Sequence, residues 1–118
     1  MTREQFLKRF SEILVEVEDG TRRKNQDYAN ADDAFFNFRG VQNLTGGRIP
    51  LEHGILSRLA EKLTRVSNLT FSEAVVREET MSDTLTDIAV YALIWRIYRE
   101  QMALHISNSD GSTIIIKG

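Results

Sequence analysis

The chain has 118 residues, of which 42% are hydrophobic and 27% charged, with a formal net charge of −2. These values are typical of one globular domain, here residues 1–118, and they provide no basic field for nucleic acid as a direct ligand. The absence of cysteine excludes disulfides, thiolate metal sites and cysteine nucleophiles. The polar residues 2–5 and the short apolar runs match neither a signal peptide nor a membrane span, so we expect a cytoplasmic protein.

A first helix is predicted at about residues 2–18. Thr2 and Gln5 match the T-x-x-Q capping box, and Asp19-Gly20 is expected to end the helix. An apolar stripe with helical spacing follows the cap, at Phe6, Phe10, Ile13, Leu14 and Val17. The acidic residues on the other faces are interpreted as a solvated surface. Two of them would face a site if the helix lined one: Glu12 and Glu16.

Residues 22–40 are less regular, with basic residues first, then acidic residues, then three phenylalanines. Two interpretations are open. In one, the segment folds over a phosphorylated ligand as an extended or broken helix, with Lys24 on phosphate and Asp27 and Asn37 on base or sugar. In the other, it is an ordered connector with turns made by its Asp and Asn residues. The connector would be held in the core by Phe35, Phe36 and Phe38.

A second helix is predicted from Pro50 to about Asn68, after a turn at residues 45–48. The turn, Thr-Gly-Gly-Arg, lacks the spacing of a phosphate-binding P-loop. Glu61 and Arg65 are one helical turn apart and are expected to form an ion pair. The apolar stripe of this helix consists of Ile55, Leu56, Leu59, Leu63 and Val66.

A third helix is predicted at about residues 81–104, and its acidic start carries the functional prediction. Thr80 and Asp83 match the T-x-x-D capping pattern, which places the start near residue 80. Residues 88–93 are all apolar or tyrosine. A helix that is apolar nearly all round is expected to be buried inside a bundle. The acidic residues would then lie at the rim of a core.

Asp83 and Asp87 share one face of this helix and repel each other, unless a cation or basic residues from another helix lie between them. Mg²⁺ binds carboxylate oxygens together with substrate phosphates. If the second and third helices pack antiparallel, Glu61 and Glu79 would add further carboxylates. The metal would orient an attacking water and lower its pKa, and nearby cations would hold phosphate: Lys24, Lys62 and Arg65. The alternative is that these acids only complement the helix dipole.

The expected fold is all-α, a small bundle of three main helices plus an ordered connector. Its acidic rim is more easily completed by a second copy of the chain, so we expect a homodimer or a higher homo-oligomer. Residues 105–118 are expected to form a tail. Within it, the β-branched run Thr113–Ile116 suits a short strand, a disordered end or a strand that pairs with another subunit.

Four blocks of residues, spread over about residues 3–100, form a pattern in a fixed order. They are Lys24-Asn25-x-Asp27-Tyr28, Asp33-x-Phe35-x-Asn37-Phe38, Arg58-x-x-Glu61-Lys62-x-x-Arg65, and Glu79-x-x-x-Asp83-Thr84-Leu85-x-Asp87-x-Ala89-x-Tyr91-Ala92. This pattern resembles the nucleotide-modification-associated domain of small phage and bacterial proteins. That domain is in turn similar to MazG-like all-α nucleotide pyrophosphohydrolases.

The resemblance implies an oligomeric helical enzyme that uses Mg²⁺ or Mn²⁺ to split nucleoside triphosphates, or a modified nucleotide, releasing pyrophosphate. It implies catalytic roles for Glu61, Asp83 and Asp87, which with Glu79 would also be the metal ligands. The nucleotide or its phosphates would be bound by Lys24, Asp27, Tyr28, Asn37, Lys62 and Arg65. The chain lacks the E-E-x-x-E and E-x-x-D patterns of that family. A non-catalytic nucleotide-binding module and a protein-interaction module, such as a phage antagonist of a host factor, therefore stay as alternatives.

Overall fold

The computed structural model describes residues 1–28, 32–71 and 74–110, and within these ranges the side chains of residues 25–28, 74–77, 79 and 105–110 are left out of the description. The elements are α1 (Arg3–Tyr28), the 3₁₀ turn η1 (Phe36–Phe38), α2 (Gly40–Leu44), α3 (Leu51–Leu69) and α4 (Ala74–Asp110). The predicted all-α fold with three main helices and an ordered connector is confirmed. Of the described helices, none is long and apolar enough to cross a membrane.

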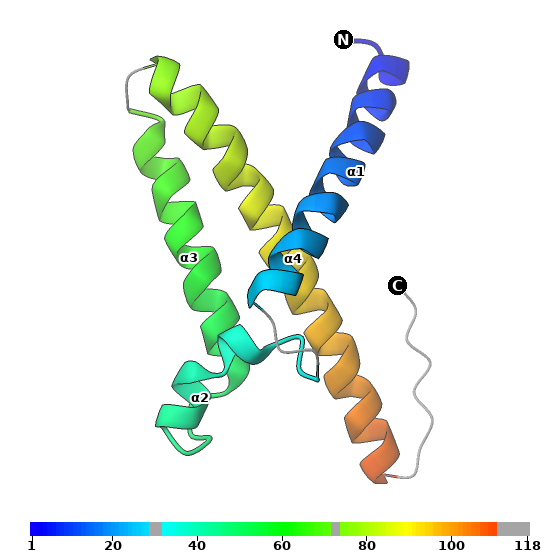
Figure 1. Cartoon of the computed structure of the whole chain (residues 1–118), viewed down its shortest axis with the longest axis vertical. Coiled ribbons are helices and arrows are strands. Elements are labelled where there is room, and N and C mark those ends of the chain that lie inside the picture. Colours follow the sequence, from blue (N-terminus) through cyan, green and yellow to red (C-terminus); the bar gives the residue numbers. More distant parts are fainter. Residues whose placement is uncertain (29–31, 72–73, 111–118) are drawn as a thin grey trace.

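The framework of the molecule is a hairpin formed by α3 and α4, which run antiparallel and pack along the length of α3 (Figure 1). The connector, residues 32–50, folds around the N-terminal end of α3 and contains η1 and α2. Helix α1 crosses α4 near its middle, and the N-terminal half of α1 points away from the hairpin (Figure 1). A cavity lies at this crossing.

Helix α1 begins as predicted and ends ten residues later than predicted. The Thr2 amide donates to Gln5 Oε1 at 2.8 Å and the Gln5 amide donates to Thr2 Oγ1 at 3.1 Å, which confirms the capping box. The predicted stop at Asp19-Gly20 is wrong, because the helix continues through Gly20 to Tyr28. An ion pair between Glu18 and Arg22, at 2.7 Å, spans the glycine. A single glycine costs a helix only about 1 kcal/mol relative to alanine, so it does not end one that has interactions on both sides.

The connector is held by a clamp between Asp33 and Arg39. The Arg39 guanidinium donates to both oxygens of Asp33, through Nε and, at 3.1 Å, through Nη2. Asp33 Oδ1 also accepts from the Phe35 amide at 3.0 Å. These hydrogen bonds from Arg39 lower the pKa of Asp33, because they stabilise its charged form. This clamp holds the connector in the conformation in which Phe35 points toward the hairpin.

The prediction of three core phenylalanines in the connector is only partly right. Phe35 is buried and meets Tyr98 of α4 edge to face, with ring centroids 5.4 Å apart. Phe38 is half-buried beside this core, but Phe36 is exposed. The 3₁₀ geometry explains the difference, since Phe36 follows Phe35 directly and points to another side of the turn. The prediction that residues 22–28 are extended or part of a broken helix is wrong, because they continue α1; that this segment binds a ligand stays a prediction.

The backbone of the connector lies directly against α3 at Gly54. A Cβ atom added at Gly54 would be 2.6 Å from the Phe38 carbonyl oxygen, closer than real Cβ contacts come. Glycine is therefore the residue that lets η1 rest on the first turns of α3. This contact fixes the position of Phe38 and of its neighbour Asn37, which both line the pocket.

Helix α3 lies where the sequence predicts it, within one residue at each end. Its N-cap is Pro50, and the preceding turn contains Gly46 and Gly47 with φ values of 61° and 86°. In its predicted apolar stripe Ile55 is fully buried, whereas Leu56 and Leu63 are exposed. Glu61 and Arg65 are both exposed, and the expected pair is not among the ion pairs of the described side chains.

Glu52, in the first turn of α3, joins the two helices of the hairpin. It accepts from Trp95 Nε1 at 3.2 Å and from Arg99 Nη1 at 2.8 Å, both on α4. The hydrogen bond from Arg99, and then the one from Trp95, lower the pKa of Glu52, while its partial burial opposes them. Beside this contact lies the core of the hairpin, which consists of Phe35, Leu51, Ile55 and Tyr98.

Helix α4 is longer than predicted at both ends. It begins at Ala74, so Thr80 is inside the helix and not its N-cap, and it ends at Asp110, so residues 105–110 are not a tail. Residues 74–110 contain neither glycine nor proline, so no residue in this range is expected to end the helix. Thr84 is the buried polar residue here, and its hydroxyl donates to the Thr80 carbonyl at 2.7 Å. The Thr113–Ile116 prediction falls outside the described residues.

Gly54→Ala is expected to destabilise the fold, and Gly20→Ala to stabilise it. Alanine favours a helix over glycine by about 1 kcal/mol, and nothing lies within 4 Å of a Cβ at Gly20. At Gly54 the clash with the Phe38 carbonyl should outweigh this gain and cost a net of about 1–3 kcal/mol. Urea unfolding of both variants measures whether the free energy of unfolding falls for Gly54→Ala and rises for Gly20→Ala. Stabilisation by Gly54→Ala would show that the connector does not rest on α3.

Acid should weaken the α3–α4 contact through Glu52. Its pKa is lower in the folded than in the unfolded chain, so its contribution is complete above the unfolded pKa of about 4.3 and is lost as pH falls through the folded pKa. Glu52→Gln cannot titrate, so its free energy of unfolding should depend less on pH in this acid range. The measurement is urea unfolding at several pH values, with unfolding detected by the fluorescence of Trp95, the sole tryptophan. Glu4→Gln, which removes an exposed carboxylate of α1, is the control. If both variants reduced the pH dependence of the free energy of unfolding equally, the prediction would be wrong.

Candidate ligand pocket

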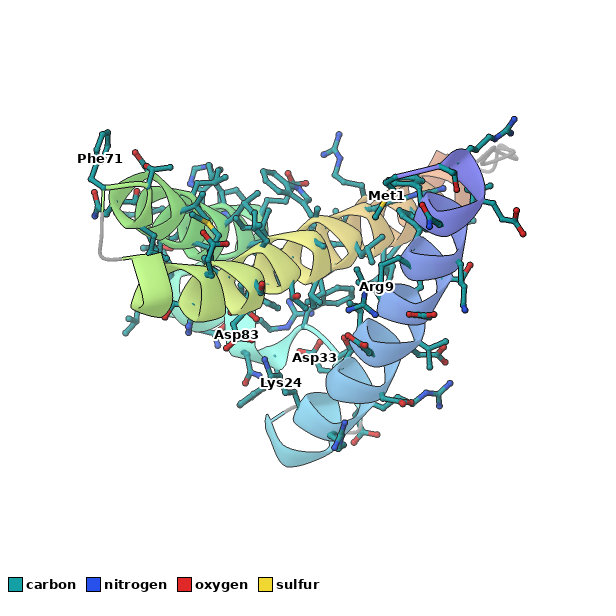
Figure 2. All side chains as sticks on the ribbon, turned by 90° about the horizontal axis from the view of Figure 1, so that it is seen from above. Met1, Arg9, Lys24, Asp33, Phe71 and Asp83 are labelled. Atoms are coloured by element: carbon teal, nitrogen blue, oxygen red, sulfur yellow. The ribbon has the colours of Figure 1, made fainter. Side chains whose placement is uncertain are left out.

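A cavity of about 560 Å³ lies where α1, the connector, α3 and α4 meet. Its charged side chains come from three helices: Glu16 and Lys24 from α1, Arg58 from α3 and Asp87 from α4. In Figure 2 the labelled Lys24 and Asp33 lie on the same side of α4 as Asp83. The pocket therefore depends on the crossing of α1 over the hairpin, and no single element contains it.

Asp87 is the electrostatic centre of the pocket. Its Oδ2 lies 3.1 Å from Lys62 Nζ of α3, and its Oδ1 lies 3.6 Å from Lys24 Nζ of α1. The side chains of Asp87 and Lys62 are largely shielded, with 26% and 22% of their surface exposed, whereas Lys24 is 72% exposed. Shielding strengthens the Lys62 pair relative to a surface ion pair, and the Lys24 pair is the weaker one. One carboxylate is thus balanced by two ammonium groups from different helices.

The aromatic wall of the pocket consists of Phe38 from the connector and Tyr91 from α4. Their rings meet edge to face, with centroids 6.1 Å apart and an interplanar angle of 83°. Asn37, next to Phe38, contributes an exposed amide that can donate and accept hydrogen bonds. Aromatic faces beside a polar amide are the kind of surface that binds a planar, hydrogen-bonding group.

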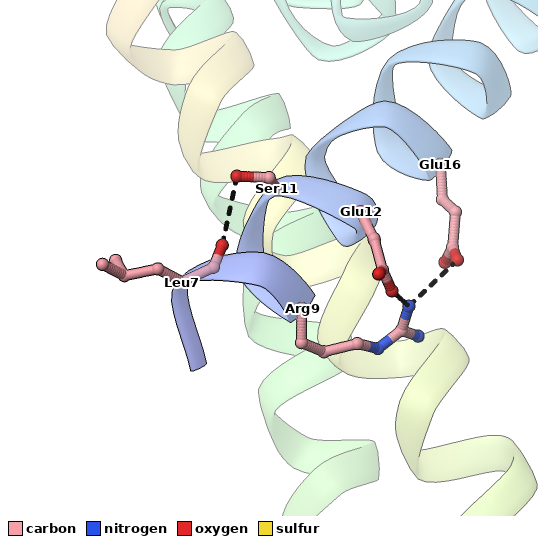
Figure 3. Close-up of polar contacts among 5 residues, drawn as sticks. All are labelled: Leu7, Arg9, Ser11, Glu12 and Glu16. Carbon is pink, nitrogen blue, oxygen red and sulfur yellow. Dashed lines mark hydrogen bonds and ion pairs between the residues drawn. The ribbon is translucent and has the colours of Figure 1, made fainter. Parts of the chain in front are cut away.

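Glu16 adds a second carboxylate on the α1 side. Its Oε1 lies 3.4 Å from Nη1 of Arg9, which also binds Glu12 Oε2 at 3.1 Å (Figure 3). All three side chains are about half-exposed or more, so these pairs order the surface of α1 without stabilising it much. The sequence named Glu12 and Glu16 as candidates if this helix lined a site, and of the two Glu16 lines the pocket.

The structure brings together about half of the predicted site residues. Lys24, Asn37 and Asp87 line the pocket, and Lys62 reaches it through its pair with Asp87. Glu61, Arg65 and Asp83 are exposed on α3 and α4 and do not line it. The side chains of three further predicted residues fall outside the described residues: Asp27, Tyr28 and Glu79.

Some pocket residues were not predicted, and helical spacing could have found two of them. Arg58 precedes Lys62 by four residues, and Tyr91 follows Asp87 by four, so each shares a helix face with a predicted residue. Phe38 could not be found this way, because the connector that carries it has no repeating pattern. All three stand in the blocks of the family resemblance, so position in those blocks was the available signal.

Three of the predicted metal ligands, Glu61, Asp83 and Asp87, do not form a cluster in the structure. Among the described side chains, no three His, Asp or Glu residues gather in a group that could hold a metal ion. Asp87 is balanced by two lysines, while Asp83 and Glu61 lie outside the pocket. Basic residues from α1 and α3 do pair with Asp87, as one of the two predicted alternatives requires. The prediction of Mg²⁺ or Mn²⁺ stays a prediction.

Comparisons of the chain with known protein families, with curated proteins and with solved structures find no match. The resemblance to MazG-like proteins thus stays a prediction from the sequence. What the fold and the pocket define is a class: an all-α protein with a pocket of charged and aromatic side chains at a helix crossing.

Proposed function

We propose that the chain binds a nucleotide in this pocket. The observation that supports the proposal is the convergence of cations (Lys24, Arg58 and, through Asp87, Lys62) with an aromatic wall (Phe38 and Tyr91). A cavity of about 560 Å³ is within the usual range for small-molecule sites. The sequence pattern independently indicates a nucleotide as the ligand.

The pocket offers chemical groups that suit both the phosphates and the base of a nucleotide. Arg58 offers a planar guanidinium, which can hold two phosphate oxygens at once. Phe38 and Tyr91 offer apolar ring surface to a base, and Asn37 can hydrogen-bond its edge. In the free protein, Lys24 and Lys62 are engaged by Asp87. A phosphate would compete with that carboxylate for both lysines, so binding is an exchange of one anion for another.

A second candidate is hydrolysis of a bound nucleoside triphosphate to monophosphate and pyrophosphate. The observation that favours it is the presence of two carboxylates, Glu16 and Asp87, in the same pocket. Mg²⁺ is commonly bound by one or two carboxylates together with substrate phosphates, so the ion would arrive with the nucleotide. Mg²⁺ or Mn²⁺ would then supply charge neutralisation and an activated water.

The proposal includes a cytoplasmic location and a homodimer or higher homo-oligomer, as the sequence predicts. The third hypothesis, a protein-interaction module such as a phage antagonist of a host factor, differs in needing no small ligand. A chain that responds to neither nucleotides nor metals in the experiments below would favour it.

Arg58→Ala should weaken binding of a nucleoside triphosphate about tenfold, because a charge-assisted hydrogen bond to phosphate contributes about 1.5 kcal/mol. Arg65→Ala is the matched control. It removes the same side chain two turns along α3, outside the pocket, and should change Kd by less than about twofold. Titration calorimetry without divalent metal measures both. Equal losses in the two variants would mean that α3 attracts phosphate only through its overall charge.

Asp87→Asn separates binding from hydrolysis by the sign of its effect. If the pocket only binds, the variant should bind triphosphate more tightly, by roughly 3- to 10-fold, because no carboxylate competes for Lys24 and Lys62. If the protein hydrolyses, the same variant should lose pyrophosphate release. The measurement is a panel of ribo- and deoxynucleoside triphosphates with Mg²⁺ or Mn²⁺, in which pyrophosphate and phosphate are read separately. A panel in which no nucleotide binds or reacts would contradict both candidates.

A further inference from the structure

We infer that a second copy of this chain packs on the apolar surface that α1 and α4 leave uncovered. This apolar α1–α4 surface is defined by Phe6, Phe10, Ile13 and Leu14 of α1 with Leu93 and Ile97 of α4. The inference rests on the proposed homo-oligomer and is independent of nucleotide binding.

Most of the apolar stripe of α1 is uncovered in the described part of its own chain, where Val17 alone of the stripe is half-buried. Phe6 and Phe10 are 54% and 53% exposed, although their rings contact each other at 6.0 Å. No side chain of α1 in residues 3–24 belongs to the core around Phe35 and Tyr98. The N-terminal half of α1 extends away from the hairpin (Figure 1). Most helical stability in proteins comes from packing of the apolar face, so this largely exposed stripe favours a further cover.

The total surface shows that the uncovered area is large. The accessible surface is 9343 Å², about 2,800 Å² more than a compact 13.5 kDa monomer exposes. Even if residues 111–118 were fully extended, they would explain only about 1,100 Å² of this excess. The radius of gyration, 17.4 Å, also exceeds the value of about 13.5 Å expected for this length. The remaining excess of about 1,700 Å² per copy is within the roughly 1,000–2,500 Å² that each copy of an obligate homodimer buries.

A second copy suits this surface because each chain carries both halves of the contact. A groove of about 700 Å³ runs between α1 and α4, with Leu14, Val17, Val90, Leu93 and Ile97 among its lining residues. The apolar stripe of one α1 can lie against the α4 of the other copy, and the reverse contact forms at the same time. Such a two-fold arrangement covers both exposed faces with one interface. The result resembles a helical bundle assembled from two chains.

The interface would also reach the ligand pocket. Val17, Thr21, Val90 and Ile94 line both the groove and the pocket, so they separate the two. A copy seated in the groove packs against the outer side of this wall and fixes the crossing angle of α1. The pocket would then be fully formed only in the dimer.

The test compares charged substitutions on and off this surface. Phe10→Glu and Ile97→Glu place a carboxylate inside the proposed interface, whereas Leu63→Glu places one on α3, at a side chain of similar exposure (51%). Analytical ultracentrifugation of the wild type should show at least two copies. The mass of Phe10→Glu and Ile97→Glu should fall to that of one copy, and Leu63→Glu should keep the wild-type mass. A monomeric wild type, or a loss of mass in Leu63→Glu alone, overturns the inference.

A second measurement is valid even if a charged variant fails to fold. The chain has no cysteine, so Phe10→Cys and Leu63→Cys each carry one label per copy. Donor- and acceptor-labelled copies of Phe10→Cys, when mixed, should transfer energy efficiently, because position 10 lies inside the interface. The Leu63→Cys mixture should transfer less, and the reverse order overturns the inference.

Other occupants would give different results in the same experiments. A monomeric wild type that binds vesicles of anionic lipid would assign the stripe to a membrane surface, and one that does not would assign it to another protein. Triphosphate titration of the wild type tests the pocket separately. Dimerisation without nucleotide binding would refute only the nucleotide proposal, and nucleotide binding by a monomeric wild type would refute only the second copy.

Discussion

The pocket depends on one close contact, the approach of the Phe38 carbonyl to the backbone of Gly54. The contact is possible because glycine has no Cβ. It lets a short 3₁₀ turn rest on α3, and the Asp33–Arg39 clamp holds the same turn from its other end. Phe38 and Asn37 reach the pocket only because these two restraints act together. The contact is thus a fold constraint with a functional consequence.

Asp87 is the second point on which the structure depends, since it joins three helices through two lysines. A carboxylate between two ammonium groups leaves a net positive charge, and this charge is available to an incoming anion once the carboxylate is displaced or shares its partners. The same residue would be a metal ligand if the lysines were drawn to phosphate. Its role therefore depends on what occupies the pocket, and its free-state pairing is compatible with both candidate functions.

Capping residues and proline correctly predicted the helix ends that they determine. Predictions of an end or a start inside a continuous helix were wrong. The Thr2–Gln5 box and Pro50 set the starts of α1 and α3, because a cap or a proline acts within one turn. Gly20 and Thr80 carried stop and start signals that packing and the absence of breakers overrode. Lys24, Asn37 and Asp87 were predictable as polar residues in a recognisable pattern. Gly54 was not, because its role is set by a backbone contact with a segment that has no pattern.

The sequence predicts that the apolar faces of α1 and α4 are buried, and a single copy of the chain leaves parts of both exposed. Residues 88–93 are apolar nearly all round and predict a helix touched from several sides, yet Leu93 is half-exposed in the isolated chain. The same mismatch occurs on α1, whose stripe predicts a core-facing helix that no described core residue meets. The two mismatches meet at the groove between α1 and α4, which Leu14 and Leu93 both line. Since large apolar faces commonly mark interaction sites, the sequence pattern favours the proposed assembly of more than one chain.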